Sequence, residues 1–234
     1  MEPGPLDDFR FVGSRRRLIE LVRAQGIEDL EILRLFDRVP RHAFLPEGVI
    51  HRAYEDAPVP IGYGQTASQP SLQAYYLHLV RPGPEDRILE IGTGSGFFTA
   101  LLALMGDRVY SVERIRELSG RARRSLDSLE FRNIALMVGD GSIGWRKFAP
   151  FDVITIAAAS PEVPEALVDQ LAEGGRMLVP VGDRSTQDLL LVRKSEGGGV
   201  QVSSVREGCT FVPLLGRYGW DEPPQGMEPE GEVR

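Results

Sequence analysis

One segment of the chain constrains its fold more than any other: an apolar run, a loop with three glycines, and then a second apolar run. Residues 87–91 have the pattern of a buried strand, Gly92, Gly94 and Gly96 interrupt the loop, and residues 97–105 have helical spacing. Such a loop lets a ligand approach the backbone and reach the free N–H groups of the helix N-terminus. The segment therefore predicts a nucleotide-type binding site in an α/β sheet.

The glycine spacing excludes two common nucleotide sites. A dinucleotide fingerprint requires glycine where Phe97 stands, and a P-loop requires a Gly-Lys-Ser/Thr that does not follow. The next two predicted strands end in Glu113 and at Asp140 and Gly141. An acid at the tip of the second strand can accept hydrogen bonds from both hydroxyls of a ribose. Glycine, acid and acid at three strand tips favour an adenosine-containing cofactor without a pyrophosphate, and S-adenosylmethionine fits.

The remaining pattern sets the architecture. Strands and helices alternate between residues 70 and 181, which predicts parallel βαβ units with right-handed crossovers. Residues 189–194 and 200–205, joined by a glycine-rich turn, have the pattern of an antiparallel hairpin. Helical spacing also recurs before residue 40. We therefore expect an α/β fold with an open, mostly parallel sheet, a C-terminal antiparallel hairpin and N-terminal helices.

Composition and charge exclude several classes. Cys209 is the single cysteine, so an internal disulfide and a multi-cysteine zinc site are both excluded, and the three histidines (His42, His51 and His78) lack zinc spacing. The net charge is -7, but five acids and one arginine in residues 221–234 contribute four of those seven negative charges. Charge therefore argues only weakly against nucleic acid. With no apolar run of about 20 residues and a proline-broken acidic start, we expect a cytoplasmic protein.

The order of the motifs resembles that of the protein-L-isoaspartate O-methyltransferase family, class I S-adenosylmethionine-dependent enzymes. The resemblance covers roughly residues 15–215, and the segment from Gly64 to Pro70 (Gly-Gln-Thr-Ala-Ser-Gln-Pro) is its most specific part. The other matching segments are Val39–Pro46, Ala53–Asp56, Pro60–Gly62, Leu89–Gly96, Val138–Gly141, Gly174–Arg176 and Phe211–Leu214.

This resemblance implies a Rossmann-like class I methyltransferase sheet and methylation of the free α-carboxylate of L-isoaspartyl residues, which starts repair through a succinimide. It implies that Ser68 is catalytic. Residue by residue, it also implies that substrate contacts Thr66, Ser68, Phe211, Val212, Pro213 and Leu214. It implies that the cofactor contacts Glu90, Gly92, Thr93, Gly94, Ser95, Gly96, Glu113, Asp140 and Gly141, with Glu113 at the ribose and the last two at the adenine.

The chemistry implied by the resemblance agrees with the residues present. A carboxylate with a pKa of about 3.5 is already ionised at neutral pH and needs no general base. The neutral hydroxyl of Ser68 can orient it without quenching its nucleophilicity. The competing structural reading makes Ser68 the N-cap of a helix over residues 71–80, and the two roles can coexist.

Departures from the family keep alternatives open. Ala67, Phe97 and Phe98 stand where the family usually has isoleucine, tyrosine and glutamine. They leave room for an enzyme that esterifies a normal aspartate in a dedicated peptide. A nucleic-acid methyltransferase is disfavoured because residues 157–161 (Ala-Ala-Ala-Ser-Pro) replace an Asp-Pro-Pro-aromatic motif. A cofactor-binding module without catalysis is disfavoured by the retained Ser68.

We expect a flexible start over residues 1–13, one methyltransferase domain over 14–220 and a disordered acidic tail over 221–234. Within the domain, residues 14–80 supply helices and the substrate loop, and residues 81–220 supply the cofactor-binding sheet. The expected partners are proteins and peptides that contain isoaspartate, with no nucleic acid, membrane or metal, and the expected state is a monomer.

Overall fold

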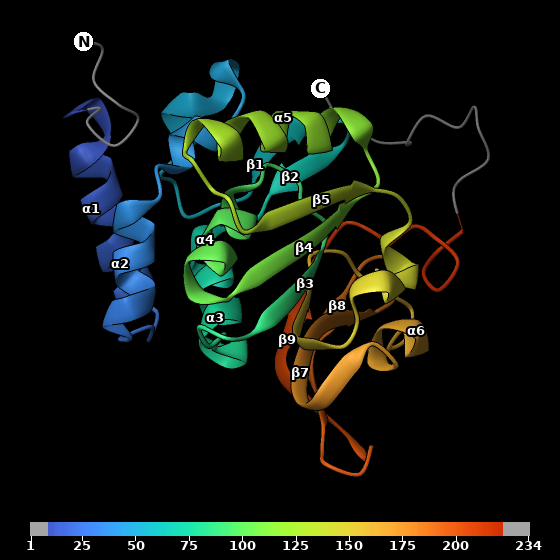
Figure 1. Ribbon diagram of the computed structural model, residues 1–234. Helices are drawn as coiled ribbons and strands as arrows, with labels where there is room; N and C mark the ends of the chain where they lie inside the picture. Colours follow the sequence, from blue (N-terminus) through green and yellow to red (C-terminus); the bar gives the residue numbers. More distant parts are fainter. Residues whose placement is uncertain (1–8, 222–234) are drawn as a thin grey trace.

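The computed structural model describes residues 9–221 (Figure 1). The disorder predicted for residues 222–234 and the flexibility predicted for residues 1–8 lie outside the described residues. Phe9–Gly13 were also predicted to be flexible, and there the prediction was wrong, because helix α1 already begins at Phe9. The physical reason is aromatic packing: the Phe11 ring stacks on His42 with a centroid separation of 4.4 Å.

The centre of the fold is a seven-stranded sheet with the strand order β5-β4-β3-β6-β7-β8-β9. The neighbouring strands β5, β4, β3, β6 and β7 pair in parallel, whereas β8 pairs antiparallel with both β7 and β9. This arrangement confirms the predicted mostly parallel sheet with a C-terminal hairpin. The strands are β3 (Arg87–Ile91), β4 (Arg108–Glu113), β5 (Ile134–Val138), β6 (Phe151–Ile156), β7 (Leu171–Gly182), β8 (Gln187–Lys194) and β9 (Val200–Cys209).

Two apolar cores, one on each face of the sheet, explain why the strands are so apolar. Ile88 packs into the core beneath the N-terminal helices, whereas its neighbour Leu89 packs into the core on the opposite face. Helices α3 and α4 cover the first face and α6 lies on the second (Figure 1). The helices are α1 (Phe9–Ala24), α2 (Leu30–Arg38), α3 (Pro70–Val80), α4 (Phe97–Met105), α5 (Arg116–Ser128) and α6 (Glu165–Val168).

The boundary between α6 and β7 differs from the sequence expectation. The sequence pattern predicts a helix over residues 164–171, but α6 covers only Glu165–Val168 and β7 begins at Leu171. Leu171 pairs with Phe151 across the sheet and is buried, so tertiary pairing overrides the local helical pattern there.

Prolines and glycines interrupt the segment between residues 40 and 70, and its sequence pattern did not predict the secondary structure that it contains. Short 3-10 helices at Arg41–Phe44 and Glu47–Arg52 lead into an antiparallel hairpin of β1 (Val59–Gly62) and β2 (Gln65–Ala67). The hairpin ends one residue before Ser68, and α3 begins at Pro70. It therefore delivers Ser68 to the start of α3.

Candidate functional site

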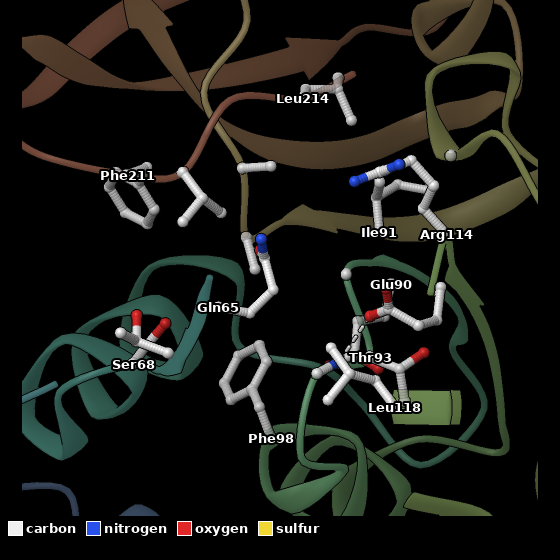
Figure 2. Close-up of a pocket in the computed structure, with 18 of the residues that line it drawn as sticks. Gln65, Ser68, Glu90, Ile91, Thr93, Phe98, Arg114, Leu118, Phe211 and Leu214 are labelled. Atoms are coloured by element: carbon white, nitrogen blue, oxygen red, sulfur yellow. Dashed lines mark hydrogen bonds between the residues drawn. The ribbon is translucent and has the colours of Figure 1, made fainter. Parts of the chain in front are cut away.

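The candidate site is a pocket at the carboxyl ends of β3 and β4. The sheet supplies its floor, β2 with the start of α3 supplies one wall, and the segment after β9 supplies another (Figure 2). Open α/β sheets bind ligands at this edge. The expected site residues that line it are Thr66, Ser68, Glu90, Gly92, Thr93, Gly94, Ser95, Glu113, Gly141, Phe211, Val212, Pro213 and Leu214.

The glycine loop is fixed by its neighbours. Gly92 has a φ of 96°, and a Cβ there would lie 3.3 Å from the Cβ of Ala157. Gly96 also has positive φ, but it faces α5, where a Cβ would come within 3.0 Å of the Ala122 Cβ. Gly96 is absent from the pocket lining. The expectation that it touches the cofactor is therefore not supported, and its requirement for glycine comes from helix packing.

Glu113 ties the glycine loop to the tip of β4. Its Oε2 accepts a hydrogen bond from the Gly94 N–H at 2.8 Å, and its Oε1 accepts one from the Ile115 N–H at 2.9 Å. The side chain is buried yet lines the pocket. Each carboxylate oxygen has about two acceptor positions, so capacity remains for ligand hydroxyls. Glu113 therefore both fixes the glycine loop and presents hydrogen-bond acceptors, its carboxylate oxygens, to the pocket.

Glu90 is a buried acid beside the same loop. Thr99 Oγ1 donates to its Oε2 at 2.6 Å, whereas its Oε1 has no hydrogen-bond partner among the described residues. Burial raises the pKa of Glu90 to about 8, and the neighbouring hydroxyls of Ser111 and Thr99 only partly offset this effect. A ligand with a donor or a positive charge would satisfy the free oxygen and favour ionisation.

Asp140 lies outside the pocket lining, although Gly141 belongs to it. The Asp140 Oδ1 accepts from both the N–H and the hydroxyl of Ser142, and its Oδ2 accepts from the Arg217 N–H at 2.9 Å. A Cβ at Gly216 would overlap this carboxylate. The Asp140 side chain thus fastens the C-terminal segment instead of facing the pocket, and of the two residues expected at the adenine only Gly141 lines the pocket.

Ser68 lines the pocket, and its backbone is held from behind. Arg41 Nη2 donates to the Ser68 carbonyl at 3.0 Å, and Arg41 Nη1 donates to the Ala53 carbonyl at 2.9 Å. The N-cap alternative for Ser68 is wrong, since Gln69 occupies the cap position without a side-chain cap bond. Asp56 Oδ1 instead accepts from the Ser71 N–H at 2.8 Å. The Ser68 hydroxyl is therefore not required for capping α3.

The chain matches the family model described as "Protein-L-isoaspartate(D-aspartate) O-methyltransferase (PCMT)" over residues 13–219. It therefore belongs to this family. It is 46% identical over 209 residues to protein-L-isoaspartate O-methyltransferase 2 of Geotalea uraniireducens, covering 88% of this chain and 95% of that protein. Identity to protein-L-isoaspartate O-methyltransferase of Geobacter metallireducens is 44%, over 88% of this chain and 96% of that one.

Solved structures agree with the fold. A Plasmodium falciparum protein-L-isoaspartate O-methyltransferase in complex with S-adenosyl-L-homocysteine matches with a TM-score of 0.76 and 26% identity, covering 86% of this chain and 98% of that one. A second protein-L-isoaspartate O-methyltransferase structure gives a TM-score of 0.76 at 32% identity, covering 88% and 67% of the two chains. The resemblance predicted from the motifs and the methyltransferase fold class are confirmed.

This member of the protein-L-isoaspartate O-methyltransferase family has an aromatic wall at the Ser68 end of its pocket. The Tyr76 ring lies 6.0 Å from Phe98 and 6.3 Å from Phe211, centroid to centroid, and the Tyr76 hydroxyl donates to the Ile156 carbonyl. Of the three departures, Phe98 and Ala67 line the pocket, whereas Phe97 is buried against Phe36 and Phe44 outside it. The departures that can affect ligands are thus Ala67 and Phe98.

Sequence reasoning missed several pocket residues of this family member. Leu72, Gln73 and Tyr76 line the pocket from α3, and their helical spacing was the available signal. Arg41 and Asp56 hold the Ser68 segment. They lie in two segments that match the family, Val39–Pro46 and Ala53–Asp56, but the resemblance assigned neither residue a role. Their contacts span 12 to 27 positions along the chain, which no local pattern encodes.

His42, His51 and His78 do not line the candidate pocket. His42 is buried, and its Nδ1 lies 2.8 Å from the Tyr54 hydroxyl, while His51 and His78 are exposed. Within residues 9–221, no three His, Cys, Asp or Glu side chains are grouped to hold a metal ion. In that same range, no helix combines the length and apolar character that a membrane crossing requires.

Proposed function

We propose that the protein transfers a methyl group from S-adenosylmethionine to the free α-carboxylate of L-isoaspartyl residues in damaged proteins and peptides. The observation that carries this proposal is that the glycine loop, Glu113 and Ser68 line one and the same pocket. Family membership supports the same reaction. The methyl ester product would then cyclise to a succinimide without further enzyme help.

The residues present fit S-adenosylmethionine. The unpartnered Oε1 of Glu90 offers a buried acceptor for a cationic group, and the Gly92 backbone approaches Ala157 too closely for a side chain. We assign Glu113 to the ribose hydroxyls, Gly141 to the adenine side, and Glu90 with Thr93, Gly94 and Ser95 to the methionine side. When bound, the cofactor supplies both the electrophilic methyl group and its leaving group.

The protein's own task is to position the nucleophile. We assign the Ser68 hydroxyl to donating a hydrogen bond to one oxygen of the substrate carboxylate, while the other oxygen is left to attack. Tyr76, Phe98 and Phe211 exclude water from that end of the pocket. Positioning of this kind can contribute about 7–11 kcal/mol to the lowering of a barrier.

The test is a methylation assay with matched peptides. Purified protein, labelled S-adenosylmethionine and a peptide containing isoaspartate should yield base-labile methyl esters. The same peptide with normal aspartate, and an RNA control, should remain unlabelled. Esters on the normal aspartate alone would favour the dedicated-peptide alternative that Ala67 and Phe98 leave open. Absence of label on the isoaspartyl peptide, while cofactor binding persists, would refute the proposal.

Replacing Glu113 with alanine is expected to weaken binding of S-adenosylhomocysteine about 100-fold. The variant loses the proposed ribose acceptor and two hydrogen bonds to backbone N–H groups, one at Gly94 in the glycine loop and one at Ile115 at the start of α5. That fold-change corresponds to about 2.7 kcal/mol. Isothermal titration calorimetry measures it, with Glu117→Ala at an exposed position of α5 as the matched control. An unchanged dissociation constant would contradict the ribose assignment.

Stability and cofactor affinity are expected to respond oppositely to pH through Glu90. Burial raises the pKa of its carboxyl from 4.5 to about 8, so the folded state retains a proton that the unfolded chain releases. This contribution to the free energy of unfolding is full below about pH 4.5 and is lost as pH rises toward 8. A cationic cofactor favours ionised Glu90, so its affinity should rise over the upper part of the same range.

Glu90→Gln removes this titration. Between about pH 6 and pH 8, the variant should lose less stability than the unmodified protein and should show weaker, flatter affinity for S-adenosylmethionine. Denaturant melts and calorimetry measure the two trends, with Glu85→Gln at an exposed turn as the control. Identical pH slopes in the protein and the Glu90→Gln variant would show that Glu90 is not the titrating group.

We propose that the protein acts as a monomer on isoaspartyl polypeptides, without nucleic acid, in the cytoplasm. Light scattering of the purified full chain tests the monomer, and fractionation of its native cells tests the location. The RNA arm of the methylation assay tests the exclusion of nucleic acid.

A further inference from the structure

Gln73 is a buried polar side chain in the wall of the pocket. It lies on α3, five positions after Ser68, and it lines the pocket while being only 8% exposed. Its Oε1 is buried and has no hydrogen-bond partner among the described residues. Buried polar atoms are normally satisfied, and an unsatisfied one lowers stability. The described residues supply no partner for this oxygen, so a ligand in the pocket that Gln73 lines is the group that could supply one.

The surroundings of Gln73 indicate which ligand would bind its amide. Gln73 and Tyr76 are one helical turn apart on α3, so they are neighbours on its surface. The Tyr76 ring contacts Phe98 and Phe211, and its hydroxyl is already bound to the Ile156 carbonyl. This wall belongs to the Ser68 end of the pocket, whereas Glu90 and Thr93 lie toward the other side of the view in Figure 2. Gln73 thus faces the ligand that Ser68 would orient.

We propose that the Gln73 carboxamide binds the peptide substrate next to the reacting carboxylate; this inference rests on the proposed function. An isoaspartyl residue presents a carboxylate that accepts hydrogen bonds and a backbone N–H that donates one. A carboxamide offers both complements, an NH₂ donor and a carbonyl acceptor. It is neutral, so it orients the carboxylate without neutralising the nucleophile. Gln73 is therefore a substrate-binding residue that acts beside Ser68.

The experiment separates binding from turnover by using two variants. Gln73→Leu keeps the approximate size and removes the amide, while Gln73→Glu keeps the shape and adds a titratable acid. Gln201→Leu, at an exposed position of β9, is the matched control for loss of an amide. For each protein we measure the affinity of an isoaspartyl peptide for the S-adenosylhomocysteine-bound form, kcat/KM for methylation, the affinity for S-adenosylhomocysteine alone, and the melting temperature.

For Gln73→Leu we expect peptide affinity and kcat/KM to fall about 10-fold, with S-adenosylhomocysteine affinity within about twofold of the unmodified protein. The melting temperature should hold or rise, because an unsatisfied buried acceptor has been removed. For Gln73→Glu, the activity relative to the unmodified protein should recover as pH falls, since the protonated acid is again neutral and donates. A purely structural glutamine would give neither result.

Three outcomes would overturn the inference: unchanged peptide affinity in Gln73→Leu, a parallel loss of S-adenosylhomocysteine affinity, or a lowered melting temperature. The proposed function fails on a different result, namely that the unmodified protein does not methylate the isoaspartyl peptide. An active protein whose Gln73→Leu variant binds peptide normally refutes the role of Gln73 and leaves the proposed function standing.

Discussion

Replacing Ser68 with alanine is expected to lower kcat for methylation of an isoaspartyl peptide about 100-fold. The affinity for S-adenosylhomocysteine should stay within about twofold of the unmodified protein. The expected size is that of losing a group that holds the carboxylate in line for attack. Ser68 lines the pocket at its aromatic end, away from the Glu113 carboxylate that anchors the glycine loop. Turnover and cofactor binding should therefore separate in this variant.

Folding should be unaffected by the same change. The N-terminus of α3 is capped by Asp56, whose Oδ1 accepts from the Ser71 N–H and whose Oδ2 accepts from the Gln69 side chain. The contact that Ser68 makes with Arg41 runs through its backbone carbonyl, which alanine retains. A drop in activity therefore reports on the hydroxyl and not on a disordered loop.

Ser71→Ala provides the matched control, three residues further along the chain. Its hydroxyl is buried without a hydrogen-bond partner among the described residues, and it is not part of the pocket lining. We expect it to leave kcat unchanged and stability equal or slightly higher. Burst and steady-state kinetics with labelled cofactor measure both variants. Equal kcat values for Ser68→Ala and Ser71→Ala would contradict the catalytic assignment.

The sheet could be predicted because its signals are local. Residues 87–91, 108–113 and 134–138 are apolar runs bounded by turns, and they form β3, β4 and β5 with those bounds. The ends of other elements could not be predicted from local pattern, because contacts with distant parts of the chain determine them. Leu171 joins β7 because it faces Phe151, and Phe11 is helical because its ring stacks on His42.

The site was partly predictable for the same reason. The order of the motifs predicted that Ser68, Glu113 and the glycine loop lie at one edge of the sheet. A motif does not, however, predict which way each side chain points. Asp140 belongs to a motif and turns toward Arg217, and Gly96 belongs to one and faces Ala122. A residue can thus be needed for the shape of a site without touching its ligand.

Motifs can also miss a residue that contacts the ligand, as they do for Gln73 in the proposal made above. Gln73 reaches the pocket through helical spacing alone and has no signature of its own. Its unpartnered oxygen is visible only once the surrounding side chains are in place. Packing, and not composition, separates a functional polar residue in a helix from a solvated one.

The largest effect on stability is expected from Arg41. Its guanidinium is fully buried, donates to the carbonyls of Ala53, Ala67 and Ser68, and lies 5.7 Å from the centre of the Phe97 ring. Burial lowers the pKa of Arg41 to about 10, which leaves it charged at neutral pH. Arg41→Met leaves these carbonyls without donors, so it should cost about 3–5 kcal/mol of folding free energy. That loss lowers the melting temperature by roughly 10 °C.

Arg41→Lys tests whether this arginine also positions Ser68. Lysine keeps the charge but not the planar fork that spans separate carbonyls, so kcat should fall about 10-fold with a smaller loss of stability. Arg38→Met, at an exposed position of α2, controls for loss of an arginine. In the Ser68→Ala background, Arg41→Lys should lower kcat no further, because there is no longer a hydroxyl to position. Additive losses in the double variant would mean that Arg41 acts on turnover by another route, and that its fork stabilises the fold without aiming Ser68.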